Sequence, residues 1–196
     1  MTTTAKKTTT KTVKAKTTKI PVLSKVPFAF EVLDAASKQR TKAKKIEVLK
    51  TYAHDSIMAL LIWNFDETAI SLLPEGDVPY GNTREDNSMT GTLSDKINDA
   101  VGKMGELGTT SLGSQDQGKA SIRREYTKFY NFLKGGNNGL SNLRRETMFI
   151  NILEGLHPLE AEIIVLVKDK NLETKYKITK EIVAEAYPDI TWGGRS

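Results

Sequence analysis

The closest match to a chemical motif in the chain is Gly113, Gly118 and Lys119, which have the GxxxxGK spacing of a phosphate-binding loop. In that loop the residue after the lysine is Ser or Thr, whose hydroxyl ligates magnesium, but here it is Ala120. The loop also follows a buried hydrophobic strand, whereas residues 102–112 are polar and interrupted by glycine. We therefore interpret the match as a chance occurrence in a glycine-rich loop.

Metal and acid–base chemistry find little support among the titratable residues. The chain has no cysteine, and its two histidines, His54 and His157, are far apart, whereas a zinc site needs three or four ligands. Both histidines precede predicted helices, where capping or solvent exposure explains them. The acidic residues nearest to a cluster lack calcium-loop spacing; they are Asp66, Glu67, Glu75 and Asp77. We predict no catalytic residue, no metal site, no cofactor and no enzymatic activity.

Positive charge is concentrated at the N-terminus. The whole chain carries a formal charge of +5 and residues 1–19 carry +6 without an acid, so residues 20–196 carry −1. The pI near 9 therefore describes the tail and does not mark the rest of the chain as a nucleic-acid-binding domain. The tail lysines are candidate phosphate contacts; they are Lys6, Lys7, Lys11, Lys14, Lys16 and Lys19. The alternative is a disordered or solubilising leader.

A second candidate nucleic-acid surface combines cations with aromatic residues. The cations are Arg123, Arg124, Lys128, Arg144 and Arg145, and the aromatics are Tyr126, Phe129 and Tyr130. Aromatics that stack bases beside cations that hold phosphates suit single strands. The pattern favours the alternative, an amphipathic helix with one core face and one solvated face.

The segments that position these residues differ in composition. Residues 1–19 are mostly Thr, Lys and Ala, bury too little apolar surface to offset chain entropy, and are predicted to be disordered. Residues 20–80 and 119–190 are predicted to be two helical parts of a single domain. Residues 81–118 contain seven of the fourteen glycines and are predicted to be a flexible insertion with one short helix. Residues 191–196 are a short C-terminal tail.

Hydrophobic spacing predicts helices throughout both parts. Pro27 suits a first helical position, and the spacing after it fits one long helix or two short ones. A helix over Ile57–Phe65, capped by Asp55 or Ser56, is apolar nearly all round and is therefore predicted to be central. The longest apolar run, Ile57–Trp63, is far shorter than the ~20 residues of a membrane span.

The second part is predicted to contain four helices. The first buries Ile122, Tyr126, Phe129, Tyr130 and Leu133, and the next, capped by Ser141, buries Leu143, Met148, Ile152 and Leu156. Leu159–Val167 fits a helix or a buried strand, and its acidic start and basic end favour the helix. Thr179 caps a last helix, which Pro188 stops. The predicted fold is all-α, an irregular helical bundle.

Four stretches resemble an uncharacterised protein family of T4-like tailed phages, particularly marine myoviruses. They are Phe28–Lys50, Leu72–Tyr80, Leu143–Lys170 and Tyr176–Pro188. The resemblance implies a viral origin and action in the cytoplasm of the infected bacterial host or in the virion. It brings no activity and no catalytic residues.

Two functions follow as expectations. The first is a phage accessory protein that binds a phage or host protein, with nucleic acid contacted by the tail, no membrane partner, and homo-oligomers left open. The alternative is a virion structural or assembly component whose tail and insertion order on neighbouring subunits.

Overall fold

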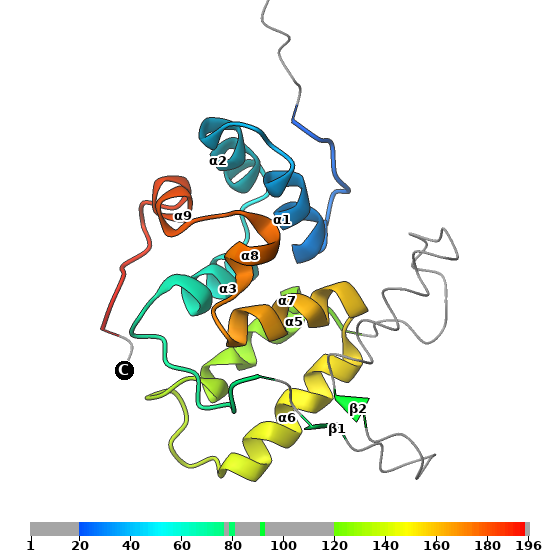
Figure 1. Ribbon diagram of the computed structural model, residues 1–196, viewed down its shortest axis with the longest axis vertical. Coiled ribbons are helices and arrows are strands. Elements are labelled where there is room, and N and C mark those ends of the chain that lie inside the picture. The colour runs from blue at the N-terminus through cyan, green and yellow to red at the C-terminus, as the bar shows by residue number, and fades with distance from the viewer. Residues whose placement is uncertain (1–19, 77–78, 81–90, 93–119, 195–196) are drawn as a thin grey trace, which may run out of the picture.

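The computed structural model describes residues 20–76, 79–80, 91–92 and 120–194, and within them the predicted all-α fold is confirmed (Figure 1). The helices are α1 (Ala29–Ser37), α2 (Lys42–Thr51), α3 (Asp55–Phe65), α5 (Ile122–Glu125), the 3-10 helix η1 (Tyr126–Phe132), α6 (Asn142–Gly155), α7 (Pro158–Lys168), α8 (Leu172–Tyr176) and α9 (Lys180–Ala186). A two-residue antiparallel pair joins β1 (Pro79–Tyr80) to β2 (Gly91–Thr92), with Pro79 opposite Thr92. The tail lysines and the Gly113–Lys119 loop lie outside the described residues.

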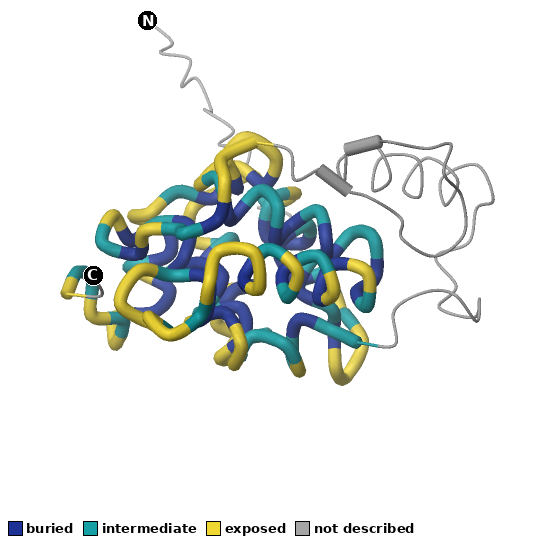
Figure 2. Tube along the Cα trace, turned by 90° about the horizontal axis from the view of Figure 1, so that it is seen from below, coloured by how far each residue is buried: buried dark blue, intermediate teal, exposed yellow. Residues whose placement is uncertain are grey.

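The central element of the fold is α3, as its apolar composition predicted. It packs against α5, η1 and α7, while α1, α2 and α9 gather at one end of the molecule and α6 lies toward the other (Figure 1). Buried residues run through the middle of the molecule, and exposed residues lie on the loops and outer faces (Figure 2). None of the helices in the described part of the chain has the length and apolar content needed to cross a bilayer.

One aromatic cluster joins helix α3 to elements that follow residue 120. The ring of Trp63 in α3 lies 5.4 Å from Phe129 and 6.0 Å from Phe132, and Phe132 in turn lies 5.3 Å from Phe149 of α6, centroid to centroid. All of these rings are buried. Residues 29–73 and 122–187 therefore share a single hydrophobic core.

The N-terminal helices differ in detail from the prediction. Pro27 precedes the first helix, and Phe28 is the N-cap, its backbone N–H donating to the Glu31 carboxylate at 2.8 Å. A break at residues 38–41 separates α1 from α2, so the two-helix alternative is correct. For α3 the N-cap is His54, and Asp55 and Ser56 lie in the first turn instead of capping it.

The single long helix predicted from Lys119 to Leu133 is wrong. Only Ile122–Glu125 is α-helical, and Tyr126–Phe132 forms a 3-10 helix. With three residues per turn, side chains three apart lie on one face, which points both Phe129 and Phe132 at Trp63. Tyr130, which an α-helical spacing would bury, is 54% exposed.

The turns around the unpredicted helix α8 use left-handed residues without glycine. Lys170 has φ 56° and Lys177 has φ 49°, and such a conformation costs a non-glycine residue about 1–2 kcal/mol. The Lys177 side chain is exposed, and its backbone carbonyl accepts a hydrogen bond from Lys45 Nζ at 2.6 Å. That interaction does not depend on the side chain of residue 177.

Lys177→Gly is therefore expected to raise the free energy of unfolding by about 0.5–1 kcal/mol, after the extra unfolded-state entropy of glycine is subtracted. Thermal denaturation followed by circular dichroism measures the change. Lys177→Ala, which keeps a Cβ, is the matched control and should stay near wild type. Equal melting temperatures for the two variants would contradict the explanation.

Candidate functional site

A groove with a mainly apolar lining opens between α5–η1 and α6, beside the predicted cations. We call it the α5–α6 groove; it has a volume of about 540 Å³ and is lined by Ala120, Glu125, Lys128, Leu143, Arg144, Thr147, Met148, Asn151, Ile152 and Gly155. The backbone N–H of Ala120 donates to the Gly155 carbonyl at 2.9 Å, which fixes the two walls together at one end.

The phase of α6 decides which of its residues face the groove. Ser141 caps the helix as predicted, its Oγ accepting from Arg144 N at 3.4 Å. The buried stripe of α6 contains Arg145, Phe149 and Ile152, whose spacing of three or four residues places them on one face of the helix. Leu143, predicted to be buried, is 75% exposed because it lies beside that stripe and at the edge of the groove.

The rim of the groove is basic. The guanidinium of Arg144 is exposed and has no partner among the described residues, whereas Lys128 Nζ lies 2.6 Å from Glu125 Oε2. A smaller depression of about 340 Å³ adjoins the groove at Ala120 and is lined in part by Arg123 and Arg124. The structure therefore brings four of the five predicted body cations to two neighbouring depressions.

The structure contradicts one predicted nucleic-acid contact, that of Arg145. The residue is 3% exposed, and its guanidinium donates to the backbone carbonyls of Asn131, Asn137 (3.2 Å) and Leu140 (2.9 Å). The guanidinium therefore holds the loop between η1 and α6 and has no donor face turned to solvent for a phosphate. The prediction that Arg145 contacts nucleic acid is wrong for this folded state.

The aromatic residues proposed to stack bases are mostly engaged within the fold. Phe129 is buried against Trp63, and the Tyr126 ring lies edge-on to His54 at 6.1 Å. Tyr130 alone of the three is exposed. Among the described residues, none of those that line the α5–α6 groove is aromatic. The amphipathic interpretation of this segment is the better one.

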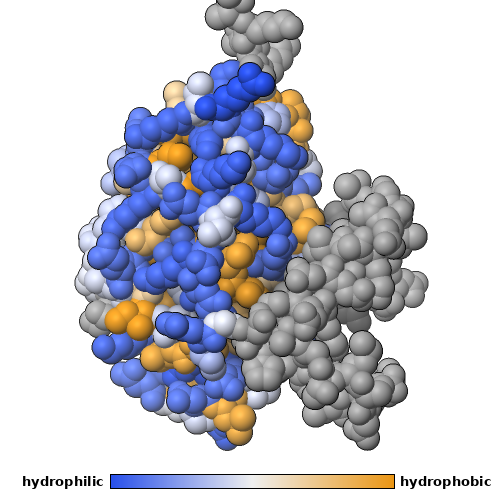
Figure 3. Space-filling model, viewed as in Figure 1, coloured by the Kyte–Doolittle hydropathy of each residue, from blue (hydrophilic) through white to orange (hydrophobic). Residues whose placement is uncertain are grey.

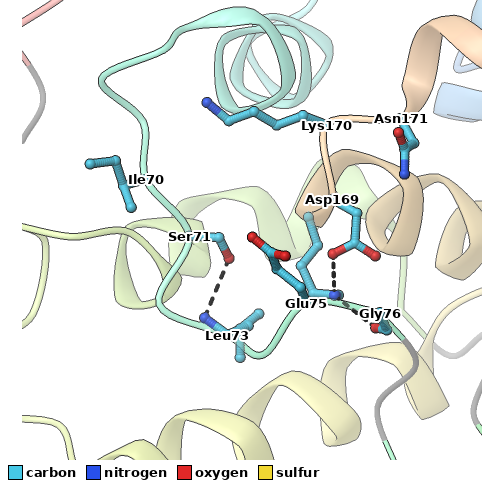
Figure 4. A pocket seen from close by; sticks show the side chains of 9 residues that line it. Ile70, Ser71, Leu73, Glu75, Gly76, Asp169, Lys170 and Asn171 are labelled. Carbon is cyan, nitrogen blue, oxygen red and sulfur yellow. Dashed lines mark hydrogen bonds and ion pairs between the residues drawn. The ribbon is translucent and has the colours of Figure 1, made fainter.

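A more polar pocket lies between residues 70–76 and the turn from α7 to α8 (Figure 4). Its volume is about 450 Å³, and the Lys168 side chain at its wall is buried. Lys168 Nζ donates to the carbonyls of Pro74 (2.7 Å) and Gly76 (2.9 Å) and pairs with the Asp169 carboxylate. All three ammonium protons thus have acceptors within the fold, two of them in the 74–76 turn, which makes Lys168 a structural residue.

Both histidines cap helices, which is one of the two explanations that the sequence offered, the other being solvent exposure. His54 Nδ1 accepts from Ser56 N at 3.1 Å, and His157 Nδ1 accepts from Leu159 N at 3.2 Å. The His157 ring also stacks on Phe30 at 5.0 Å. Its burial lowers the pKa of His157, while the nearby Glu31 carboxylate acts in the opposite direction. The described residues contain no group of three or more acidic or histidine side chains placed to hold a metal ion.

The His157 cap is expected to weaken in mild acid. A folded-state pKa below the ordinary 6.5 means that the unfolded chain binds the proton first, so the contribution of His157 to stability is complete above pH 6.5 and is lost as pH falls toward the folded pKa. The urea midpoint of wild type should therefore fall in this window more steeply than that of His157→Asn, whose amide oxygen caps without titrating. Parallel pH curves for the two proteins would contradict this assignment.

A buried carboxylate ties three helix starts together beneath the smaller depression. Glu160, in the first turn of α7, is 0% exposed; its Oε1 accepts from Ala29 N at the start of α1 (3.2 Å) and its Oε2 from Ile122 N at the start of α5 (2.9 Å). Burial raises the pKa of Glu160, and the two backbone N–H donors and Arg123 oppose that rise. Sequence reasoning placed Glu160 at a helix start without predicting its burial.

These features define a helical domain that has a single hydrophobic core and, at its surface, an apolar groove with a basic rim. The chain belongs to a family of unknown function, DUF6433, whose family model matches residues 32–100 and 110–174. No curated protein and no solved structure matches the chain.

Proposed function

We propose that this protein is a phage-encoded accessory protein that acts by binding and not by catalysis. The folded helical domain docks a protein partner, and the N-terminal lysines contact nucleic acid. The observation that carries the proposal is the separation of charge, +6 in residues 1–19 against −1 in residues 20–196. The phage origin and an action in the infected host cell rest on the four stretches that resemble proteins of T4-like phages.

Lysines in or next to α1 and α2 are paired within the fold, which favours the tail over these helices as the part that contacts nucleic acid. Lys38 pairs with Asp34 at 2.6 Å, Lys42 pairs with Glu185 at 2.8 Å, and Lys45 Nζ donates to the Lys177 carbonyl. These cations of α1 and α2 are used partly within the fold, and acids lie beside them. A phosphate backbone therefore meets a weaker positive electrostatic field at α1 and α2 than at the tail.

A pull-down of the tagged full chain from infected cells, with and without nuclease, tests the proposal. A protein partner that stays bound after nuclease treatment is expected, and loss of every partner on nuclease treatment would contradict the docking role. For binding of duplex DNA by the tail, a plot of the logarithm of the binding constant against the logarithm of the salt concentration should have a slope no steeper than about −5. The reason is that each of the six lysines releases about 0.9 counterions. Binding that survives deletion of residues 1–19 unchanged would reject the tail's role.

The virion alternative makes a separate prediction. A structural or assembly component would be present in purified particles in many copies, and mass spectrometry of particles measures that directly. Its absence from particles would leave the accessory role in the host cell as the proposal.

A further inference from the structure

We propose that the α5–α6 groove binds an amphipathic helix of the partner protein, one with an apolar stripe flanked by Asp or Glu side chains. This inference rests on the proposed function, because it names the surface with which the helical domain docks its partner. Helices that dock in grooves do so through apolar side chains at positions i, i+3 or i+4, and i+7.

The apolar part of the groove gives such a stripe a place to bind. Leu143 is 75% exposed at the edge, Met148 is partly buried, and Ile152 is buried. On the face of the molecule seen in Figure 3, hydrophobic side chains are scattered among hydrophilic ones. The groove has a volume of about 540 Å³.

The charges around the groove select an acidic partner. Arg144 has no partner among the described residues, and Arg124 is exposed at the adjoining depression. Among the described residues, the one acid that lines the groove is Glu125, which is only 16% exposed and is paired with Lys128. A carboxylate of the incoming helix therefore meets cations and little competing negative charge.

Two other occupants fit less well. A second copy of this chain whose groove packed against this groove across a twofold axis would bring Arg144 near its own symmetry mate, and the two guanidinium groups would repel each other. Single-stranded nucleic acid binds by stacking bases on aromatic rings, and the residues that line the groove include none.

Selection of random peptides about four helical turns long on the immobilised full-length protein tests the inference. The selected peptides are expected to share helical apolar spacing with flanking Asp or Glu. Their synthetic forms should bind wild type at least tenfold more tightly than Leu143→Asp or Arg144→Glu, and binding should weaken as salt is raised. Val22→Asp and Arg40→Glu make the same kinds of charge change at an exposed aliphatic residue and an exposed arginine elsewhere, and should bind like wild type. Circular dichroism confirms that each variant is folded.

Several results would overturn the inference. These are no enrichment of peptides, selected peptides that are basic, binding that Leu143→Asp and Arg144→Glu leave unchanged, competition by an oligonucleotide, or a wild-type dimer that Leu143→Asp dissociates. A protein partner recovered from cells equally well by wild type and by both groove variants would reject this groove while the proposed function stands. Absence of any nuclease-resistant partner would reject the proposed function, and the peptide selection would still report on the groove.

Discussion

Glu160→Ala is expected to lower the free energy of unfolding by about 4 kcal/mol. The change leaves the backbone N–H groups of Ala29 and Ile122 without an acceptor in a buried place, and each buried unsatisfied donor costs about 1–3 kcal/mol. A cavity adds to the loss. Urea denaturation measures the effect, and hydrogen exchange should show that the starts of α1 and α5 lose protection together.

Two companion variants separate the carboxylate from its side-chain volume. Glu160→Gln keeps one acceptor oxygen but turns an amide NH₂ toward an N–H donor, so we expect a loss of about 2 kcal/mol. Glu47→Ala removes an exposed glutamate of α2 and should change stability by less than about 0.5 kcal/mol. If Glu160→Ala were as stable as Glu47→Ala, the carboxylate would not connect the three helices.

Arg145→Ala is expected to cost about 3 kcal/mol, because three backbone carbonyls lose a charged donor and the loop between η1 and α6 loses its only guanidinium anchor among the described residues. Arg145→Lys should recover part of this, since one ammonium group does not reproduce the geometry of the fork. Denaturation and hydrogen exchange of residues 131–140 measure the change.

The neighbouring Arg144→Ala is the matched control for this prediction. Arg144 is exposed and has no partner among the described residues, so its loss should change stability by less than about 0.5 kcal/mol while it weakens binding in the groove. The two adjacent arginines thus have opposite expected phenotypes, stability for Arg145 and binding for Arg144. Equal stability of the two variants would contradict the structural role of Arg145.

The sequence of α7 contained a signal for the burial of two charged residues. That signal lies in the spacing of the residues and not in the composition of the helix. Its buried face runs through Ile163, Ile164 and Val167, and continuing that spacing in both directions reaches Glu160 and Lys168. These two charged residues were expected to favour a helix by interacting with the helix dipole. The structure places Glu160 in the first turn and Lys168 in the last turn, as that expectation requires. Their place on the apolar stripe, however, marks them as buried groups that need internal partners, and both have such partners.

The sequence by itself determined the helical class, the central apolar helix α3, the capping role of Ser141, and the helical state of α7. Each of these depends on local spacing or on hydrogen bonds within one turn, which neighbouring residues specify. Only the tertiary structure decided the 3-10 form of Tyr126–Phe132, the burial of Arg145 and the exposure of Leu143. These outcomes depend on which face of a helix meets Trp63 and on how the loop between η1 and α6 turns its carbonyls toward Arg145, and helical spacing alone does not set either of them.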